Sequence, residues 1–269
     1  MSSEFQPTGA SPLLDGVRVL VTGATSGIGL AMARALATAG ATVAIGSRDR
    51  DRARAAAAGL PAPDGRAFGV ALDVRDDGRV AAGVAEVVAL AGGLDVLVNN
   101  AGLGMRTVNP NFMTDPQPFW QVSPDAFRDL LATNLTGYFL TARAVVPHFL
   151  DQGRGRIVNI SMNHETMRRR GFVPYGPSRA GAESLSHIMA ADLQGTNITV
   201  NMLLPGGATL TGMIPDEADG QVRSRLLNPE VMAAPIRWLC SPQAEGVSGE
   251  RIVATEFDGW LAARMAAGG

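Results

Sequence analysis

Lysine is absent from this chain of 269 residues, so its 23 strongly basic residues are all arginine. Any chemistry that elsewhere uses a lysine amine must here be carried out by another group. Cysteine occurs only once, at Cys240, which excludes a disulfide within the chain and fits a reducing compartment. We expect this cysteine to be a buried structural thiol.

Strong net charge and long apolar runs are also missing. The formal net charge is −2, which gives no electrostatic footprint for nucleic acid. No apolar run reaches membrane-spanning length without charges or glycines. Residues 1–12 are polar and lack the basic and apolar segments of a signal peptide, so they are interpreted as a flexible tail. These features predict a cytoplasmic protein that binds neither nucleic acid nor a membrane.

Apolar runs alternate with helical patterns along most of the chain, of which 46% is hydrophobic. This alternation predicts one α/β domain, residues 13–269, in which helices cover both faces of a doubly wound parallel sheet. We expect strands at residues 17–21, 42–45, 67–72, 94–99, 156–160, 199–204 and 251–255. We expect helices at residues 30–39, 50–58, 78–91, 125–151, 175–194 and 229–239. Two irregular stretches, residues 103–121 and 211–224, are typical of lids or binding loops.

The most informative motif is the glycine-rich segment between the first strand and the first helix. Glycine allows the backbone to turn tightly and to approach a pyrophosphate. The free N–H groups and the dipole of a helix N-terminus favour the charge of that group. The segment therefore predicts a nucleotide site formed by Gly23, Thr25, Ser26, Gly27, Ile28 and Gly29.

The end of the second strand bears on which dinucleotide binds. In dinucleotide-binding folds, an acidic residue about 20 positions past the glycine turn holds the ribose 2′-hydroxyl of NAD. Ser47 stands in place of that acid and Arg48 follows it, and a guanidinium beside a hydroxyl suits a 2′-phosphate. The pair favours NADP(H), with NAD(H) the alternative because Asp49 comes next. The alternative role of Arg48 is that it does not bind the cofactor and merely faces solvent or caps the following helix.

Several motifs in this order resemble the short-chain dehydrogenase/reductase family. They are the Gly-x3-Gly-x-Gly turn, the run Asn99-Asn100-Ala101-Gly102, the mid-helix Asn134, and a tyrosine followed by a basic residue at Tyr175 and Arg179. The resemblance spans about Leu14 to Asp258 and implies the compact Rossmann-type fold. It also implies further cofactor contacts from Asp73, Val74, Asn100, Ala101, Gly102, Pro205, Gly206, Thr209 and Thr211.

The expected catalytic pair departs from the family pattern at one position. Tyr175 and Arg179 share a helix face at four-residue spacing. By resemblance, Tyr175 is the general acid/base, Arg179 replaces the family's lysine at the nicotinamide ribose, and Asn134 holds a water of the proton relay. Arginine keeps the positive charge that favours tyrosinate. It does not deprotonate, and its planar fork is bulkier than an ammonium.

The family's catalytic serine has no direct counterpart, because counting back from Tyr175 places Met162 at its position. We select Ser161 as the donor to the substrate carbonyl; Asn163, His164 or a weakened contact are the alternatives. If Ser161 acts, alternation along the strand places Met162 in the core. If the strand keeps the family register, Met162 faces the nicotinamide and Ser161 is buried or bonded internally.

The resemblance implies reversible hydride transfer between NADP(H) and a carbonyl compound or secondary alcohol, favouring ketone reduction. It further implies a homo-oligomer, a tetramer or dimer joined through two long helices, and no metal is expected. The alternative is a nucleotide-binding sensor or scaffold that keeps the fold without the chemistry. The departures at Arg179 and Met162 favour this alternative, whereas Tyr175 and Asn134 oppose it.

The substrate is only coarsely indicated. Residues 103–121 are either an insertion over the substrate or surface elaboration. Their apolar members Phe112, Met113, Phe119 and Trp120 predict a hydrophobic pocket. The run Arg168-Arg169-Arg170 either attracts an anionic substrate or is a solvated basic loop.

Overall fold

The computed structural model describes residues 13–63, 65–214 and 224–267. The expected tail, residues 1–12, and much of the second irregular stretch lie outside these residues. The described residues form one seven-stranded sheet in the order β3-β2-β1-β4-β5-β6-β7, with every neighbouring pair parallel. The strands are β1 (Arg18–Thr22), β2 (Thr42–Ser47), β3 (Ala67–Ala71), β4 (Val96–Asn99), β5 (Gly155–Ile160), β6 (Ile198–Leu204) and β7 (Arg251–Val253).

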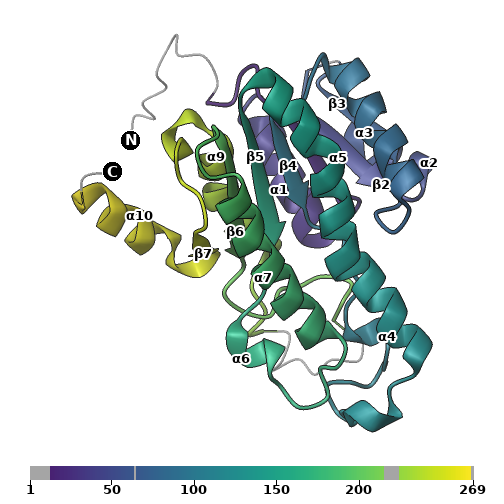
Figure 1. Cartoon of the computed structure of the whole chain (residues 1–269). Coiled ribbons are helices and arrows are strands. Elements are labelled where there is room, and N and C mark those ends of the chain that lie inside the picture. Colours follow the sequence, from purple (N-terminus) through teal and green to yellow (C-terminus); the bar gives the residue numbers. More distant parts are fainter. Residues whose placement is uncertain (1–12, 64, 215–223, 268–269) are drawn as a thin grey trace, which may run out of the picture.

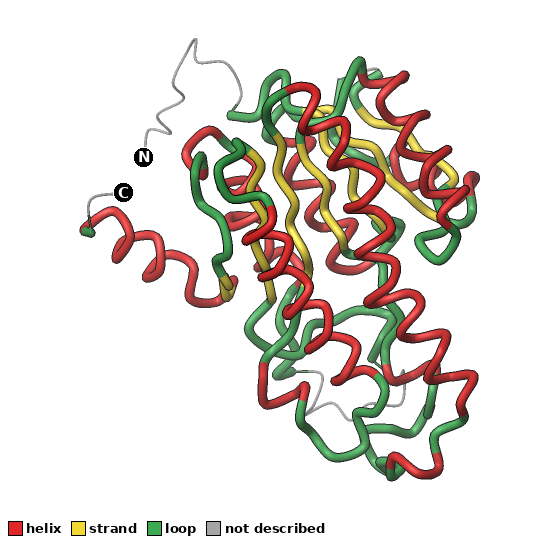
Figure 2. The backbone as a smooth tube through the Cα atoms, viewed as in Figure 1, coloured by secondary structure: helices red, strands yellow, loops and turns green. Residues whose placement is uncertain are grey.

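Helices cover both faces of this sheet (Figures 1 and 2). They are α1 (Gly27–Thr38), α2 (Arg50–Ala58), α3 (Asp77–Ala91), α4 (Pro124–Leu131), α5 (Gly137–Gln152), α6 (His164–Met167), α7 (Tyr175–Asp192), α9 (Ala233–Cys240) and α10 (Phe257–Ala266). One buried apolar cluster packs the sheet against α1 and α9, and a second packs it against α3 and α5. The alternation and the doubly wound α/β architecture predicted from the sequence are confirmed.

Strand β1 illustrates how the sequence produces two packed layers. Val19 and Val21 belong to the cluster beneath α1, whereas Leu20 belongs to the cluster beneath α3 and α5. All three are essentially inaccessible to solvent. An apolar run, rather than an alternating one, is what a parallel strand buried on both faces requires.

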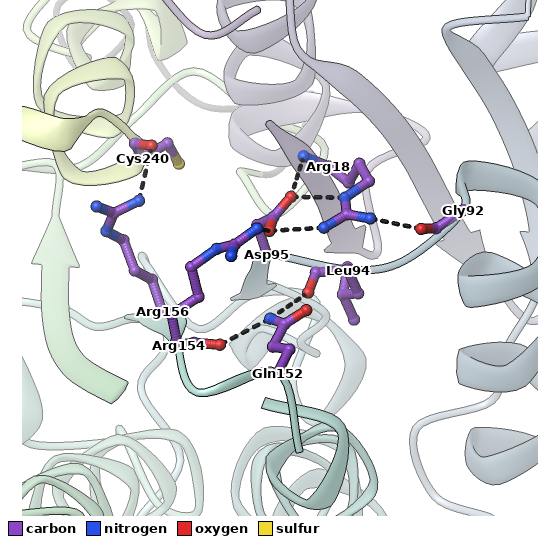
Figure 3. Close-up of polar contacts among 8 residues, drawn as sticks. All are labelled: Arg18, Gly92, Leu94, Asp95, Gln152, Arg154, Arg156 and Cys240. Atoms are coloured by element: carbon purple, nitrogen blue, oxygen red, sulfur yellow. Dashed lines mark hydrogen bonds and ion pairs between the residues drawn. The ribbon is translucent and has the colours of Figure 1, made fainter. Parts of the chain in front are cut away.

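The amino ends of the strands are fastened by a buried carboxylate (Figure 3). Asp95, just before β4, accepts hydrogen bonds from Arg18 Nε at 2.7 Å and Nη2 at 2.8 Å, and from Arg154 at 3.3 Å. Burial alone would raise the pKa of Asp95, but the hydrogen bonds and charges of the arginines hold it below its ordinary value. This cluster joins β1, β4 and β5 at the end opposite their carboxyl termini.

The helix expected at residues 125–151 is interrupted. The structure divides it into α4, a π-helical turn at Ala132–Thr136, and α5. Helices α6 and α10 were not predicted, and α10 is held by packing of Trp238 against Phe257 and Trp260. None of the helices in the described ranges combines the length and the apolar character needed to cross a membrane.

Candidate active site

A cavity of about 480 Å³ lies where the strands end at their carboxyl termini, which is where open α/β sheets bind ligands. Its wall contains residues that follow β1, β4, β5 and β6. Of the residues selected from the sequence, it brings together Gly23, Ser26, Gly27, Ile28, Gly29, Asn100, Gly102, Ser161, Tyr175, Arg179, Pro205, Thr209 and Thr211. The other selected residues are not part of this wall; they are Thr25, Ser47, Arg48, Asp73, Val74, Ala101, Asn134 and Gly206.

The glycine-rich turn presents an uncapped helix start to the cavity. The Ser26 side chain makes no capping bond to α1, whereas Asp49 and Asp76 cap α2 and α3. Gly23 and Gly27 have φ angles of 65° and 56°, a region that side-chain-bearing residues rarely adopt. The first N–H groups of α1 therefore remain available to an anion, as a pyrophosphate requires.

The Asn99-Asn100 pair fastens the turn and the sheet. Asn100 Nδ2 donates to the carbonyl oxygens of Thr22 at 2.9 Å and Gly23 at 3.2 Å. A Cβ on Gly29 would collide with this amide, so the last glycine of the motif is required by Asn100. Asn99 is fully buried and donates to Asn159 at 3.0 Å, which links β4 to β5.

The end of β2 lies outside the cavity and carries an exposed arginine. Asp49 accepts hydrogen bonds from the N–H groups of Asp51 and Arg52. Asp73 is bound by the Arg75 guanidinium, and these hydrogen bonds lower the pKa of Asp73. Arg48 makes no hydrogen bond or ion pair within the described ranges. The two nearby carboxylates are thus engaged, and the residues fit a dinucleotide with a 2′-phosphate.

Arg179 is almost completely buried, at 3% exposure, against two aromatic rings. Its guanidinium carbon lies 5.5 Å from the ring centre of Tyr175 and 5.6 Å from that of Tyr138. Nη1 donates to Tyr138 Oη at 2.6 Å and to the Ile160 carbonyl at 2.9 Å. A Cβ on Gly102 would come within 2.6 Å of Nη2, so the glycine after the asparagine pair makes room for this side chain.

Asn134 is fully buried in the π-helical turn, and its side chain holds a loop. Oδ1 accepts from the Leu103 N–H at 2.8 Å, and Nδ2 donates to the Leu103 carbonyl at 2.9 Å. Nδ2 also lies 3.3 Å from Ser178 Oγ, near the start of α7. The turn explains a mid-helix asparagine, since π-helical turns inside α-helices frequently occur at functional sites. Its amide fixes the backbone that directly follows Gly102, the glycine that faces the Arg179 guanidinium.

The segment after β5 differs from the expected arrangement. Met162 lines the cavity instead of entering the core, and Ser161 borders the same cavity but is 8% exposed. Ser161 Oγ donates to Glu183 Oε1 at 2.5 Å. A hydroxyl has one proton to donate, and a carboxylate is a stronger acceptor than a ketone. This geometry does not favour Ser161 as the carbonyl donor, because its proton is used by Glu183, and a cavity-facing Met162 is the arrangement expected if the strand keeps the family register.

Glu183 is the centre of a buried polar cluster behind this segment. It also contacts His164 Nε2 at 2.9 Å and Arg251 Nε at 2.8 Å. Burial raises the pKa of the Glu183 carboxyl, but the hydrogen bonds from Ser161, His164 and Arg251 outweigh this and leave it lowered. His164 is therefore engaged as well. Asn163 lines the cavity and donates one amide N–H to the Gly206 carbonyl at 3.0 Å.

Comparison with known proteins agrees with this geometry. Residues 17–221 match the family described as short chain dehydrogenase. The chain belongs to the short-chain dehydrogenase family. It is therefore an oxidoreductase of alcohols and carbonyl compounds.

The alignments with individual relatives cover most of both proteins. Gluconate 5-dehydrogenase of Gluconobacter oxydans is 35% identical over 193 residues, 72% of each protein. The 3-oxoacyl-(acyl-carrier-protein) reductase FabG of Thermotoga maritima is 32% identical over 246 residues, 89% of this chain and 96% of the relative.

Two examples show that solved structures share this fold. The 3-ketoacyl-(acyl-carrier-protein) reductase of Brucella melitensis, complexed with NADH, has a TM-score of 0.77 at 30% identity and covers 89% of this chain and 96% of its own. A gluconate 5-dehydrogenase of Burkholderia cenocepacia, in complex with NADP and tartrate, has a TM-score of 0.78 at 28% identity. The match covers 93% of this chain and 98% of the Burkholderia protein.

The remaining wall of this short-chain dehydrogenase is largely apolar. Phe112 and Met113 line the cavity, so the stretch 103–121 contributes to its wall. Phe119 and Trp120 do not, contrary to expectation: they are 66% and 71% exposed and pack on each other. Of the three consecutive arginines, only Arg169 lines the cavity, with its guanidinium 5.2 Å from the ring centre of Phe172.

Two residues of the site were missed from the sequence. Tyr138 lies four residues after Asn134, and Glu183 lies four residues after Arg179, so each shares a helix face with a selected residue. That spacing is the signal that could have identified them. Both are buried, with exposures of 1% and 7%.

Proposed function

We propose that this chain is an NADP(H)-dependent ketone reductase that also catalyses the reverse oxidation of a secondary alcohol. The observation that carries the proposal is the position of Tyr175 against the buried charge of Arg179. Both residues line the same cavity as the uncapped start of α1. The proton donor and the dinucleotide site therefore share one cavity.

The proposed chemistry assigns proton transfer to Tyr175. A nicotinamide dinucleotide, when bound, supplies or accepts the hydride. During reduction the Tyr175 hydroxyl donates its proton to the carbonyl oxygen. The tyrosinate left behind lies beside the Arg179 guanidinium, whose positive charge favours it. Arg179 donates no proton, because a guanidinium stays protonated in proteins.

Two neighbouring asparagines complete the proposed site. Ser161 and His164 are engaged by Glu183, whereas the Asn163 amide has a second N–H besides the one bound to Gly206. We therefore assign the contact with the carbonyl oxygen to Asn163. Asn134 fixes the Leu103 backbone beside the pair, so we expect it to support the proton relay by positioning.

The preference for NADP(H) rests on the end of β2. Arg48 is exposed there, while Asp49 caps α2 and Asp73 is bound to Arg75. An arginine next to the Ser47 hydroxyl suits a 2′-phosphate, and an engaged carboxylate is a poor partner for the ribose of NAD. The two solved relatives contain different cofactors, NADP in the Burkholderia protein and NADH in the Brucella protein, so the preference rests on the residues at the end of β2.

The substrate is proposed to be an apolar ketone with an anionic group. Phe112, Met113 and Phe172 supply an apolar wall. Arg169 lies in the same wall and pairs with no carboxylate in the part of the chain that the structure describes. Its stacking on Phe172 gives the guanidinium a defined place from which to bind an anion.

A homo-oligomer is proposed on the exposed apolar side chains of the two long helices. Phe139 and Leu150 on α5 are 46% and 51% exposed, and Ile188 on α7 is 55% exposed. Light scattering on a sizing column distinguishes a dimer or tetramer from a monomer.

The test of the proposed function is turnover of NADPH with a panel of ketones that differ in apolar size and in charge. We expect oxidation of NADPH with apolar ketones, and faster turnover at low concentration with those that bear a carboxylate. A nucleotide-binding sensor is the second candidate, because Met162 occupies the place of the expected hydroxyl. Tight binding of NADPH without turnover of any ketone would favour the sensor.

A further inference from the structure

Both tyrosines of the chain contact the same guanidinium. The sequence contains two tyrosines, Tyr138 on α5 and Tyr175 on α7. Their ring centres lie 5.6 and 5.5 Å from the guanidinium carbon of Arg179. We propose that Tyr138 is a positioning residue that holds Arg179 against Tyr175 and so allows arginine to stand where the family has lysine. This inference rests on the proposed role of Tyr175.

The hydrogen bonds give Tyr138 a specific part in holding the guanidinium. Arg179 Nη1 donates to Tyr138 Oη at 2.6 Å and to the Ile160 carbonyl at 2.9 Å. Tyr138 Oη in turn donates to the same carbonyl at 3.1 Å. The three groups form a closed triangle that includes the last residue of β5. The phenol thus ties Arg179 to the strand end that leads into the cavity wall.

A buried arginine needs such a partner more than a lysine does. Arg179 is 3% exposed and has five N–H donors in a fixed plane, and its Nε has no partner in the described part of the chain. Every buried donor without an acceptor costs free energy. A lysine amine carries its charge on one rotatable group and would not reach the positions that the planar fork occupies. The Tyr138 phenol supplies an acceptor at a position that the planar guanidinium of an arginine reaches and a lysine amine does not.

The Tyr138 phenol is a neutral partner, so the positive charge of Arg179 is not cancelled and still acts on Tyr175. Within the described residues no carboxylate bonds to Arg179, and the nearby Glu183 is taken up by Ser161, His164 and Arg251. Burial raises the pKa of Tyr138, so its hydroxyl stays protonated. A carboxylate in the same position would neutralise the guanidinium. A neutral phenol orients it and leaves its field to act on the tyrosinate form of Tyr175.

The experiment combines Tyr138→Phe with Arg179→Lys in all four combinations. We expect Tyr138→Phe to lower kcat at least about tenfold and to move the pH profile of kcat to higher pH. In the Arg179→Lys background the same substitution is expected to change kcat by less than about threefold, since lysine does not use the phenol. Equal losses in both backgrounds, or no loss, would overturn the inference.

A spectroscopic readout separates this inference from the proposed function. Tyr138→Phe leaves Tyr175 as the only tyrosine, so tyrosinate absorbance reports its ionisation without any substrate. We expect the first tyrosinate step of the unaltered protein to move to higher pH in Tyr138→Phe, and no such movement when Arg179 is lysine. An unmoved step overturns the positioning role even if the protein turns over no ketone.

Thr141→Val is the matched control for stability. Thr141 is another fully buried hydroxyl of α5; it lies within hydrogen-bond distance of Asn99 Oδ1 and of the Gly137 and Tyr138 carbonyls, and it makes no bond to the Tyr138 phenol or to Arg179. We expect this variant to lower Tm while leaving the tyrosinate step and the pH profile unchanged. If Thr141→Val shifts them as Tyr138→Phe does, the effect belongs to loosening of α5 and the inference fails. Should Tyr138→Phe alone fold poorly, the Arg179→Lys double variant is expected to recover folding.

Discussion

Replacement of Ser161 by alanine is expected to lower stability much more than catalysis. The structure places its hydroxyl in a buried hydrogen bond of 2.5 Å to Glu183. A hydrogen bond to a charged group contributes about 1.5–3 kcal/mol. In a protein of this size each kcal/mol corresponds to about 2–4 °C in Tm. The expected fall in Tm is therefore about 3–12 °C. The Glu183 carboxylate is not left unpaired by the substitution, because it keeps His164 and Arg251 as partners.

The catalytic effect distinguishes the two possible roles of the hydroxyl. Loss of one donor to a developing oxyanion costs about 10²–10³ in kcat. We expect Ser161→Ala to change kcat by less than about threefold, measured by NADPH absorbance below the new Tm. A fall in kcat of about a hundredfold with an unchanged Tm would refute the reasoning, because the hydroxyl would then act on the substrate.

The neighbouring position supplies the complementary substitution. Met162 lines the cavity, and the family resemblance predicts a serine at its position. Met162→Ser is expected to raise kcat, because it adds a hydroxyl where a carbonyl oxygen can accept from it. Met162→Ala is the matched control, since it removes the same side chain without adding a donor. Equal rates of the two variants would contradict the assignment of the strand register.

Three further predictions address the cofactor, the fold and the substrate. Arg48→Ala is expected to raise the Kd of NADPH by about tenfold to a hundredfold and to leave NADH unchanged in fluorescence titrations; an equal effect on both would contradict it. Asp95→Asn is expected to lower the free energy of unfolding by about 2–3 kcal/mol at pH 7 in urea titrations. Because the folded-state pKa of Asp95 is lowered, its contribution is present above about pH 4 and is lost as the pH falls further, so the two proteins should converge in acid. Arg169→Gln is expected to raise KM for ketones that bear a carboxylate and to spare neutral ketones of the same skeleton; a uniform rise would place the substrate elsewhere.

The sheet and the nucleotide turn were predictable because their signals are local. Apolar runs such as residues 17–21 are long enough to identify buried strands. The Gly23–Gly29 turn and Asn100 have their counterparts in the structure, where the amide packs on Gly29. Cofactor specificity at Arg48 stays a prediction.

The orientation of side chains around the cavity was not predictable in the same way. The choice between Ser161 and Met162 depends on strand register and on Glu183, which lies 22 residues further along the chain. The π-helical turn at Asn134 breaks the regular helical period, so a pattern read at 3.6 residues per turn gives one continuous helix. Tyr138 acquires its meaning only when α5 and α7 pack together around Arg179.

The most direct test of the central claim compares the unaltered protein with Tyr175→Phe in NADPH oxidation and in NADPH binding. The change removes one phenolic oxygen and keeps the ring that packs on Arg179 and Phe172. We predict that Tyr175→Phe lowers kcat by about 10²–10⁴, as loss of a general acid does, while the Kd of NADPH stays within about twofold. A Tyr175→Phe variant that reduces ketones at a near-normal rate would contradict the account.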